Sequence, residues 1–302
     1  MRTVALLSLA LACACGTGAP AGVSAEGPPR PARKKQRRPG VNEWFTPAGA
    51  RAPVDLAGSA AAGVRFTEYR RGRFRVWHAR GIPGPRADAI WRALGERGKG
   101  DLVPLLVRDD VFHEGTHGQL VSDGGRVERE GVLSLAQALV VREKQLGEPA
   151  ARMRAALASA RPSESLRHSV ASGEPLQADL DADPEGRPFD LALTVYRGPI
   201  EDVAPFLVSG AGLEPRAPEL AAALRHWRQR YGAAPRRWTG GRALELAVER
   251  PPRALADLRA LAWQFYLMCP AAPGGSFRDN EPADELLVRL EQRRWTCSWF
   301  VE

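Results

Sequence analysis

Cysteine, lysine and long hydrophobic runs are all scarce in this chain of 302 residues. Only Cys269 and Cys297 lie beyond the first 15 residues, so that part of the chain can form at most one internal disulfide. Lysine occurs four times against an abundance of arginine, which we interpret as genome composition and not as a functional signal. No apolar run beyond the first residues reaches the roughly 18 that a membrane-spanning helix needs.

The basic charge is also missing from most of the chain. The formal net charge is +8, but residues 1–40 contain seven basic residues against Glu26, a net charge of +6. Residues 41–302 therefore keep only +2. A nearly neutral folded part argues against nucleic acid as a partner.

The first 15 residues have the pattern of an export signal. Arg2 precedes a short apolar run over residues 4–12, and Cys13 and Cys15 each follow an alanine. This arrangement resembles the lipobox of bacterial lipoproteins and predicts diacylglycerol on Cys13, with Cys15 as the alternative. Ordinary cleavage after residues 12–14, which would release an exported protein without a lipid, stays open.

Residues 16–40 predict a disordered tether. They are rich in Gly, Pro, Ala and Arg and contain almost no large apolar side chain, so they cannot offset the entropy of ordering. Their basic cluster at 30–38 can lie against anionic headgroups or act as a solvated spacer.

Residues 41–175 predict an N-terminal α/β subdomain. Alternating apolar residues over 64–79, with Arg71-Gly72 between them, indicate a hairpin. Ala87, Ile90, Trp91 and Leu94 have helical spacing, and residues 102–107 form an apolar run typical of a strand buried on both faces. Residues 133–146 indicate an amphipathic helix.

One string in this subdomain indicates chemistry. His113-Glu114-Gly115-Thr116-His117 would place two imidazoles on one face of a helix, where they could hold zinc while Glu114 acts as the general base. The glycines at 115 and 118 oppose a helix, and no third ligand stands out. We therefore expect a polar loop with no cofactor, and we keep a zinc site as the alternative.

Residues 176–302 predict a C-terminal α+β domain, with 161–188 as a joining loop. The strand 189–196 alternates, and a helix carrying Trp227 and Tyr231 follows. A strand at 244–249, helices at 256–268 and 282–291, and a closing strand at 295–301 complete it. The whole chain is expected to be α+β, a mixed sheet with packed helices in two subdomains behind the tether.

The C-terminal part resembles a bacterial family known as domain of unknown function 4253. The residues that carry the resemblance are Leu224–Ala233 with Trp227 and Tyr231, residues 244–252 ending in Pro251-Pro252, Phe265-Tyr266, Cys269-Pro270 and the aromatic strand 295–300. Relatives tend to have an acid after Cys-Pro, where Ala271 stands, and end toward Trp-Trp-Asp, where this chain has 299–302. The resemblance implies no activity.

Cys269 and Cys297 lie within this region. In an oxidising envelope they can pair, and the alternative is two buried thiols. No histidine in the motif accompanies Cys269, so the sequence does not favour a nucleophilic role.

Three functions follow from these patterns. The first is a non-catalytic binding or interaction module, exported and held at the cell envelope by its lipid, with a protein or small-molecule ligand that the sequence does not name. The second is a zinc hydrolase that uses His113, Glu114 and His117. The third is an immunity-like protein that masks a partner, which would need an exposed apolar patch.

Overall fold

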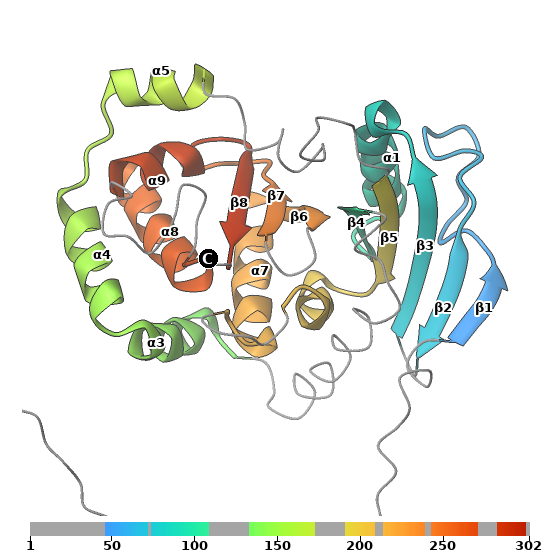
Figure 1. The fold of residues 1–302 in the computed structure, drawn as a ribbon, viewed down its shortest axis with the longest axis horizontal. Coiled ribbons are helices and arrows are strands. Elements are labelled where there is room, and N and C mark those ends of the chain that lie inside the picture. Colours follow the sequence, from blue (N-terminus) through green and yellow to red (C-terminus); the bar gives the residue numbers. More distant parts are fainter. Residues whose placement is uncertain are drawn as a thin grey trace, which may run out of the picture. The chain divides into compact units, whose positions relative to one another are not determined.

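The strands in the described part of the chain form one mixed sheet of eight (Figure 1). The computed structural model describes residues 46–71, 74–108, 133–172, 191–208, 214–238, 243–270 and 283–299. The sheet order is β1-β2-β3-β5-β4-β6-β7-β8, and every neighbouring pair is antiparallel except β4 and β6, which are parallel. The strands are β1 (Thr46–Ala50), β2 (Thr67–Arg71), β3 (Phe74–Ile82), β4 (Leu102–Arg108), β5 (Leu191–Arg197), β6 (Ala234–Trp238), β7 (Ala243–Ala247) and β8 (Arg294–Ser298).

One face of the sheet packs against helix α1 (Gly84–Arg97) and the segment before β2. Ile90 and Leu94 of α1 are completely buried there, together with Leu193 of β5. Pro85 stands at the start of α1, where a missing N–H costs nothing. The helix ends at Gly98, where a Cβ atom would lie 2.6 Å from Leu102, so a larger residue would push α1 away from β4.

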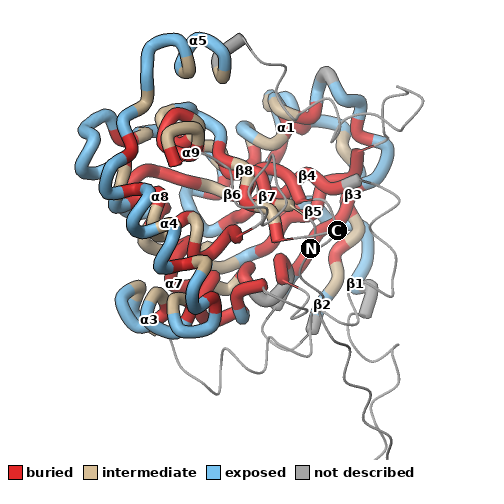
Figure 2. Tube along the Cα trace, turned by 60° about the vertical axis from the view of Figure 1, so that its left-hand side comes forward, coloured by how far each residue is buried: buried red, intermediate tan, exposed pale blue. Residues whose placement is uncertain are grey.

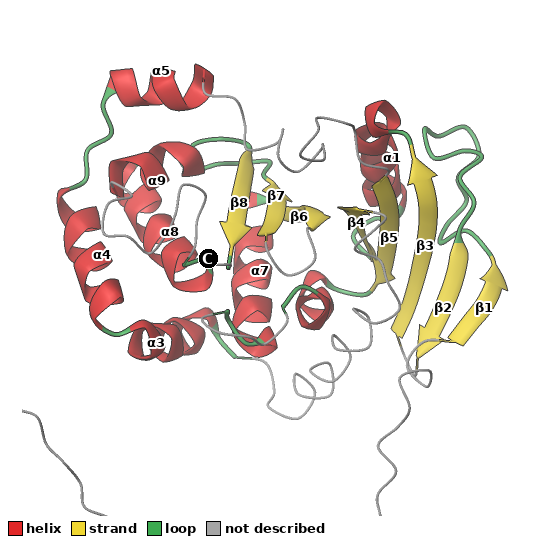
Figure 3. Cartoon of the chain, in the orientation of Figure 1, coloured by secondary structure: helices red, strands yellow, loops and turns green. Residues whose placement is uncertain are grey.

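The opposite face carries the larger core, and the buried residues of both cores are red in Figure 2. Trp227, Phe265 and Trp295 pack against one another, with Trp227 5.4 Å from Phe265 and 6.3 Å from Trp295 between ring centroids. These aromatics are buried core, as their spacing predicts. The helices on this side, drawn red in Figure 3, are α3 (Leu135–Leu146), α4 (Glu148–Ser159), α5 (Glu164–Ser172), the short 3-10 helix η2 (Ile200–Phe206), α7 (Ala217–Tyr231), α8 (Leu255–Met268) and α9 (Ala283–Leu290).

The α+β class and the mixed sheet with packed helices are therefore confirmed. β5 lies between β3 and β4, so strands from before and after residue 175 share the sheet. β4 is buried along residues 102–107, because α1 covers one face and the larger core the other. The joining loop expected over 161–188 contains α5, whose first turn is capped where the N–H of Leu166 donates to Oγ of Ser163 at 3.1 Å.

Several expectations concern residues outside the described ranges. These are the export signal with Cys13 and Cys15, the tether, and the string from His113 to His117. Within the described ranges, every helix is too short or too polar to cross a membrane.

Candidate functional site

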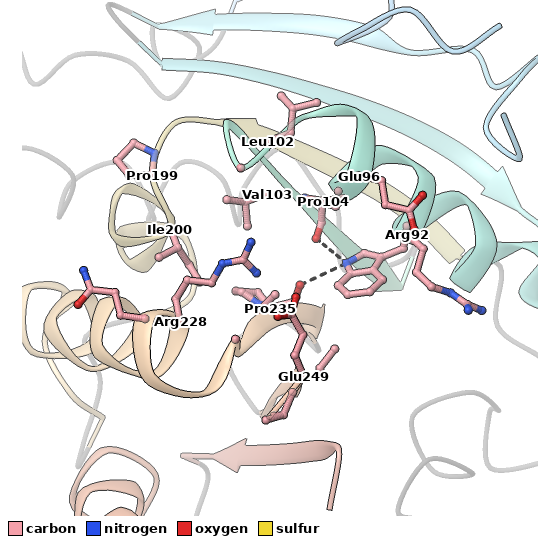
Figure 4. Close-up of a pocket in the computed structure, with 18 of the residues that line it drawn as sticks. Arg92, Glu96, Leu102, Val103, Pro104, Pro199, Ile200, Arg228, Pro235 and Glu249 are labelled. Atoms are coloured by element: carbon pink, nitrogen blue, oxygen red, sulfur yellow. Dashed lines mark hydrogen bonds between the residues drawn. The ribbon is translucent and has the colours of Figure 1, made fainter. Parts of the chain in front are cut away.

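A pocket of about 690 Å³ lies where α1 and the C-terminal end of α7 approach the same end of the sheet (Figure 4). The sheet contributes the first residues of β4 and β6 and the residues that follow β7. The start of η2 closes one side. This volume is within the range of small-molecule sites, roughly 300–1,000 Å³.

Two prolines explain why the sheet opens at this point. The parallel ladder between β4 and β6 pairs Leu106 with Arg237 and continues toward the far end of the strands. Two residues earlier, Pro104 and Pro235 stand on the two strands, and neither can donate a backbone hydrogen bond. The indole N–H of Trp91 instead donates to both carbonyl oxygens, at 2.8 Å and 3.2 Å. Trp91 therefore fixes α1 to both strands and forms a rigid wall of the pocket.

The pocket is lined by charges of both signs. Arg225 and Glu201 neutralise each other, because Nε of Arg225 lies 2.9 Å from Oε1 of Glu201. Arg228 has no ion pair or side-chain hydrogen bond within the described ranges, and Figure 4 shows its guanidinium extended toward Val103 and Pro235. The remaining charged lining residues are Arg92, Glu96, Glu249 and Arg293, of which Arg92 points away from Arg228 in Figure 4.

The end of α7 sets the positions of Arg228 and Glu249. The helix stops at Gly232, which has a left-handed φ of 65° and whose N–H donates to the carbonyl of Arg228. A Cβ atom at this position would lie 2.5 Å from Oε2 of Glu249. Glycine is therefore required at position 232 for two reasons, its left-handed backbone conformation and the close approach of the Glu249 carboxylate. A guanidinium and a carboxylate consequently stand at the same end of the pocket.

The residues that the sequence predicts for chemistry are not in this pocket. His113, Glu114 and His117 lie outside the described residues, so the zinc site stays a prediction. Across the ranges that the structure describes, no group of three or more His, Cys, Asp or Glu side chains could hold a metal ion.

Cys269 and Cys297 form a disulfide, with their Cα atoms 4.9 Å apart. Both side chains are completely buried. The bond ties the end of α8 to β8, beside the indole of Trp299, which donates to the carbonyl of Met268 at 2.8 Å. It belongs to the large core and has no part in the pocket.

The sequence does not predict the pocket. Trp91 and Arg228 lie in segments whose apolar spacing predicts helices. That spacing does not show that one indole will bridge two distant strands. The available signals were the two prolines, each inside or beside a strand, and a glycine directly after an aromatic helix. Each of these residues indicates the end or interruption of a strand or helix. Only the order of the strands in the sheet shows that these points lie close together.

Residues 192–299 match a family model described as Domain of unknown function (DUF4253). The match confirms the resemblance indicated by the motifs of the C-terminal part, and it extends from β5 to the end of β8. It includes the disulfide, α7 and the residues of β6 and β7 that line the pocket, but not α1 or β4. Comparisons with curated proteins and with solved structures gave no match.

Proposed function

We propose that this protein is a non-catalytic binding protein of the cell envelope, and that the pocket between α1 and α7 takes its ligand. The observation that supports this proposal is the pocket itself, which combines a ligand-sized volume, a rigid indole wall and an inward guanidinium. Convergent polar groups in an otherwise partly apolar hollow are the usual features of a small-molecule site.

The ligand is a small molecule or a chain end that presents an acidic group to Arg228. Arg225 is already paired with Glu201. Arg228 therefore offers a planar set of donors that suits a carboxylate or a phosphate. Val103, Pro199 and Ile200 provide apolar contact for the rest of the ligand. Glu249, at the same end, favours a ligand that also carries a donor or a positive charge.

Thermal unfolding of the purified full-length protein tests this function against a panel of N-acetyl amino acids, dipeptides and dicarboxylates. A ligand at about 100 times its Kd stabilises the folded state by about 2.7 kcal/mol. For a protein of this size that raises the Tm by roughly 5–10 °C. Arg228→Gln should weaken binding by about 10- to 100-fold, because it removes a charge-assisted hydrogen bond.

Arg253→Gln is the matched control, since it removes the same charge from an exposed residue outside the pocket. A panel in which every stabilising compound acts equally on wild type, Arg228→Gln and Arg253→Gln would contradict the proposed site.

The envelope location rests on the leader sequence. We propose that Cys13 carries diacylglycerol and is the first residue of the mature protein, with residues 16–40 as the tether. Mass spectrometry of the mature N-terminus checks this. The Cys13→Ser variant should lack the mass of the diacylglycerol group. An unmodified N-terminus beyond Cys15 in the wild type would contradict the lipid anchor.

The immunity-like function stays a prediction. It needs an exposed apolar patch, and the large apolar side chains exposed within the described ranges are Val140, Val141 and Leu255. Val140 and Val141 lie on α3 and Leu255 begins α8. Three such residues on two helices do not favour this function over the pocket.

A further inference from the structure

A second hollow, of about 360 Å³, lies over β2, β3 and the end of β5. The segment that follows β1 forms its other side. It shares no lining residue with the pocket between α1 and α7. We call it the arginine crevice, and its polar and aromatic lining consists of Arg51, Asp55, Glu68, Arg75, Trp77 and Arg197.

Strand register brings these side chains to one face of the sheet. Glu68 of β2 pairs with Trp77 of β3, which pairs with Val195 of β5. Residues two positions apart on a strand share a face. Arg75 therefore stands on the face of Trp77, and Arg197 stands on the face of Val195. Four separate segments thus contribute cations or a carboxylate to a single hollow.

The crevice has an excess of positive charge. Glu68 is only 2% exposed, and Nε of Arg70 donates to its Oε1 at 2.6 Å. This hydrogen bond lowers the pKa of Glu68 against the opposing effect of burial, and the charges of Arg75 and Arg51 lower it further. Arg70, which lies outside the lining, neutralises Glu68. The three arginines that line the crevice then stand against the single carboxylate of Asp55, which leaves a surplus of two positive charges.

Arg197 is held in place over the buried ring of Trp77. Cζ of Arg197 lies 5.2 Å from the centroid of the Trp77 ring, and its Nη2 donates to the carbonyl of Pro53 at 2.8 Å. The indole N–H of Trp77 is buried and has no hydrogen-bond partner among the described residues, which is unfavourable for a donor. Arg51 and Arg75 are exposed and make no ion pair or hydrogen bond with another described side chain. They are therefore the two cations available to a ligand.

We propose that the arginine crevice binds a phosphate group, either as inorganic phosphate or as a phosphate ester. The dianion matches the surplus of two charges, and guanidinium groups bind phosphate oxygens in pairs. Arg51 and Arg75 hold the phosphate, while Arg197, stacked on Trp77, adds a third positive charge to the lining. The crevice is much larger than a phosphate ion, given that a water molecule occupies about 30 Å³, so it has room for the group to which the phosphate is attached.

Isothermal titration of the full-length protein tests the site with three probes at one ionic strength. These are inorganic phosphate, glycerol 1-phosphate and acetate. Both phosphates should bind and acetate should bind more weakly, because it carries a single charge. Arg75→Gln should weaken phosphate binding by at least about tenfold, the loss expected for a charge-assisted hydrogen bond. Arg51→Gln combined with Arg75→Gln should abolish it.

The matched control is again Arg253→Gln, which lowers the net charge equally at an exposed residue far along the chain. It should leave phosphate binding unchanged, because Arg253 does not line the crevice. Tighter binding of glycerol 1-phosphate than of inorganic phosphate assigns the site to an ester, and the reverse order assigns it to the free ion. Absence of binding by both phosphates, or equal losses in Arg75→Gln and Arg253→Gln, would overturn the proposal.

Discussion

Gly232 shows how much a single residue contributes at the end of α7. Its φ of 65° is unfavourable for any residue with a Cβ, by roughly 1–2 kcal/mol. A side chain there would also displace the carboxylate of Glu249. We expect Gly232→Ala to lower the free energy of unfolding by roughly 1–2 kcal/mol, measured by urea denaturation.

Gly95 is the matched control for this substitution. It lies inside α1, and a Cβ at its position would meet nothing within 4 Å. Alanine favours the helix by up to about 1 kcal/mol over glycine, so Gly95→Ala should hold or raise stability. Equal destabilisation by both variants would show that the conformation of Gly232 is not the cause.

The burial of individual residues could be predicted where the local sequence pattern alone decides which way a side chain points. Trp295, Cys297 and Trp299 share a buried face because side chains alternate along a strand, and this alternation is visible in the sequence. Arg228 could not be predicted in the same way. Its role depends on α1 and β4, which are more than a hundred residues away in the chain.

At the scale of elements, the sequence predicts a helix or strand where apolar residues recur regularly, and fails to predict it where they do not. The helices around Leu139, Trp227 and Phe265 were predicted because apolar residues recur along them. β1 and β6 were not predicted, since Pro47, Gly49 and Pro235 interrupt a pattern that already covers only five residues in each strand. α5 was missed because its segment has few large apolar residues.

The disulfide joins two elements that the chain separates by 28 residues. Closing a loop of that length restricts the unfolded chain and contributes roughly 3–4 kcal/mol on the chain-entropy model. We expect a reductant to lower the calorimetric Tm by roughly 10 °C, given about 2–4 °C per kcal/mol for a protein of this size. The paired variant Cys269→Ala/Cys297→Ala should no longer respond to the reductant. In the mature protein, where the proposed lipid blocks Cys13 and Cys15 keeps its thiol, the intact bond leaves one free thiol in the denatured, unreduced chain, and three free thiols would contradict the bond.

At the scale of the whole molecule, Arg236 links segments of the chain that lie far apart, since 148 residues separate it from its partner Asp88. It is buried in β6, and its guanidinium contacts Glu245 of β7 and Asp88 of α1. Leu244 and Leu246 of β7 face the larger core, so Glu245 between them stands on the same face of the sheet as α1. The Arg236 contacts, together with the indole of Trp91, therefore fix α1 to strands β4, β6 and β7 and hold that wall of the pocket in place.

Because of these contacts, one substitution should lower the free energy of unfolding strongly, and a second should restore most of it. Arg236→Met leaves Glu245 buried without this partner, and we expect a loss of about 3–5 kcal/mol in the free energy of unfolding. Adding Glu245→Leu removes the uncompensated charge and should restore most of that loss. Arg230→Gln is the control, because the pair of Arg230 with Asp257 is half exposed and contributes less than about 1 kcal/mol. Urea denaturation of the four proteins gives the comparison. A loss in Arg236→Met no greater than in Arg230→Gln would mean that apolar packing alone holds α1 on the sheet.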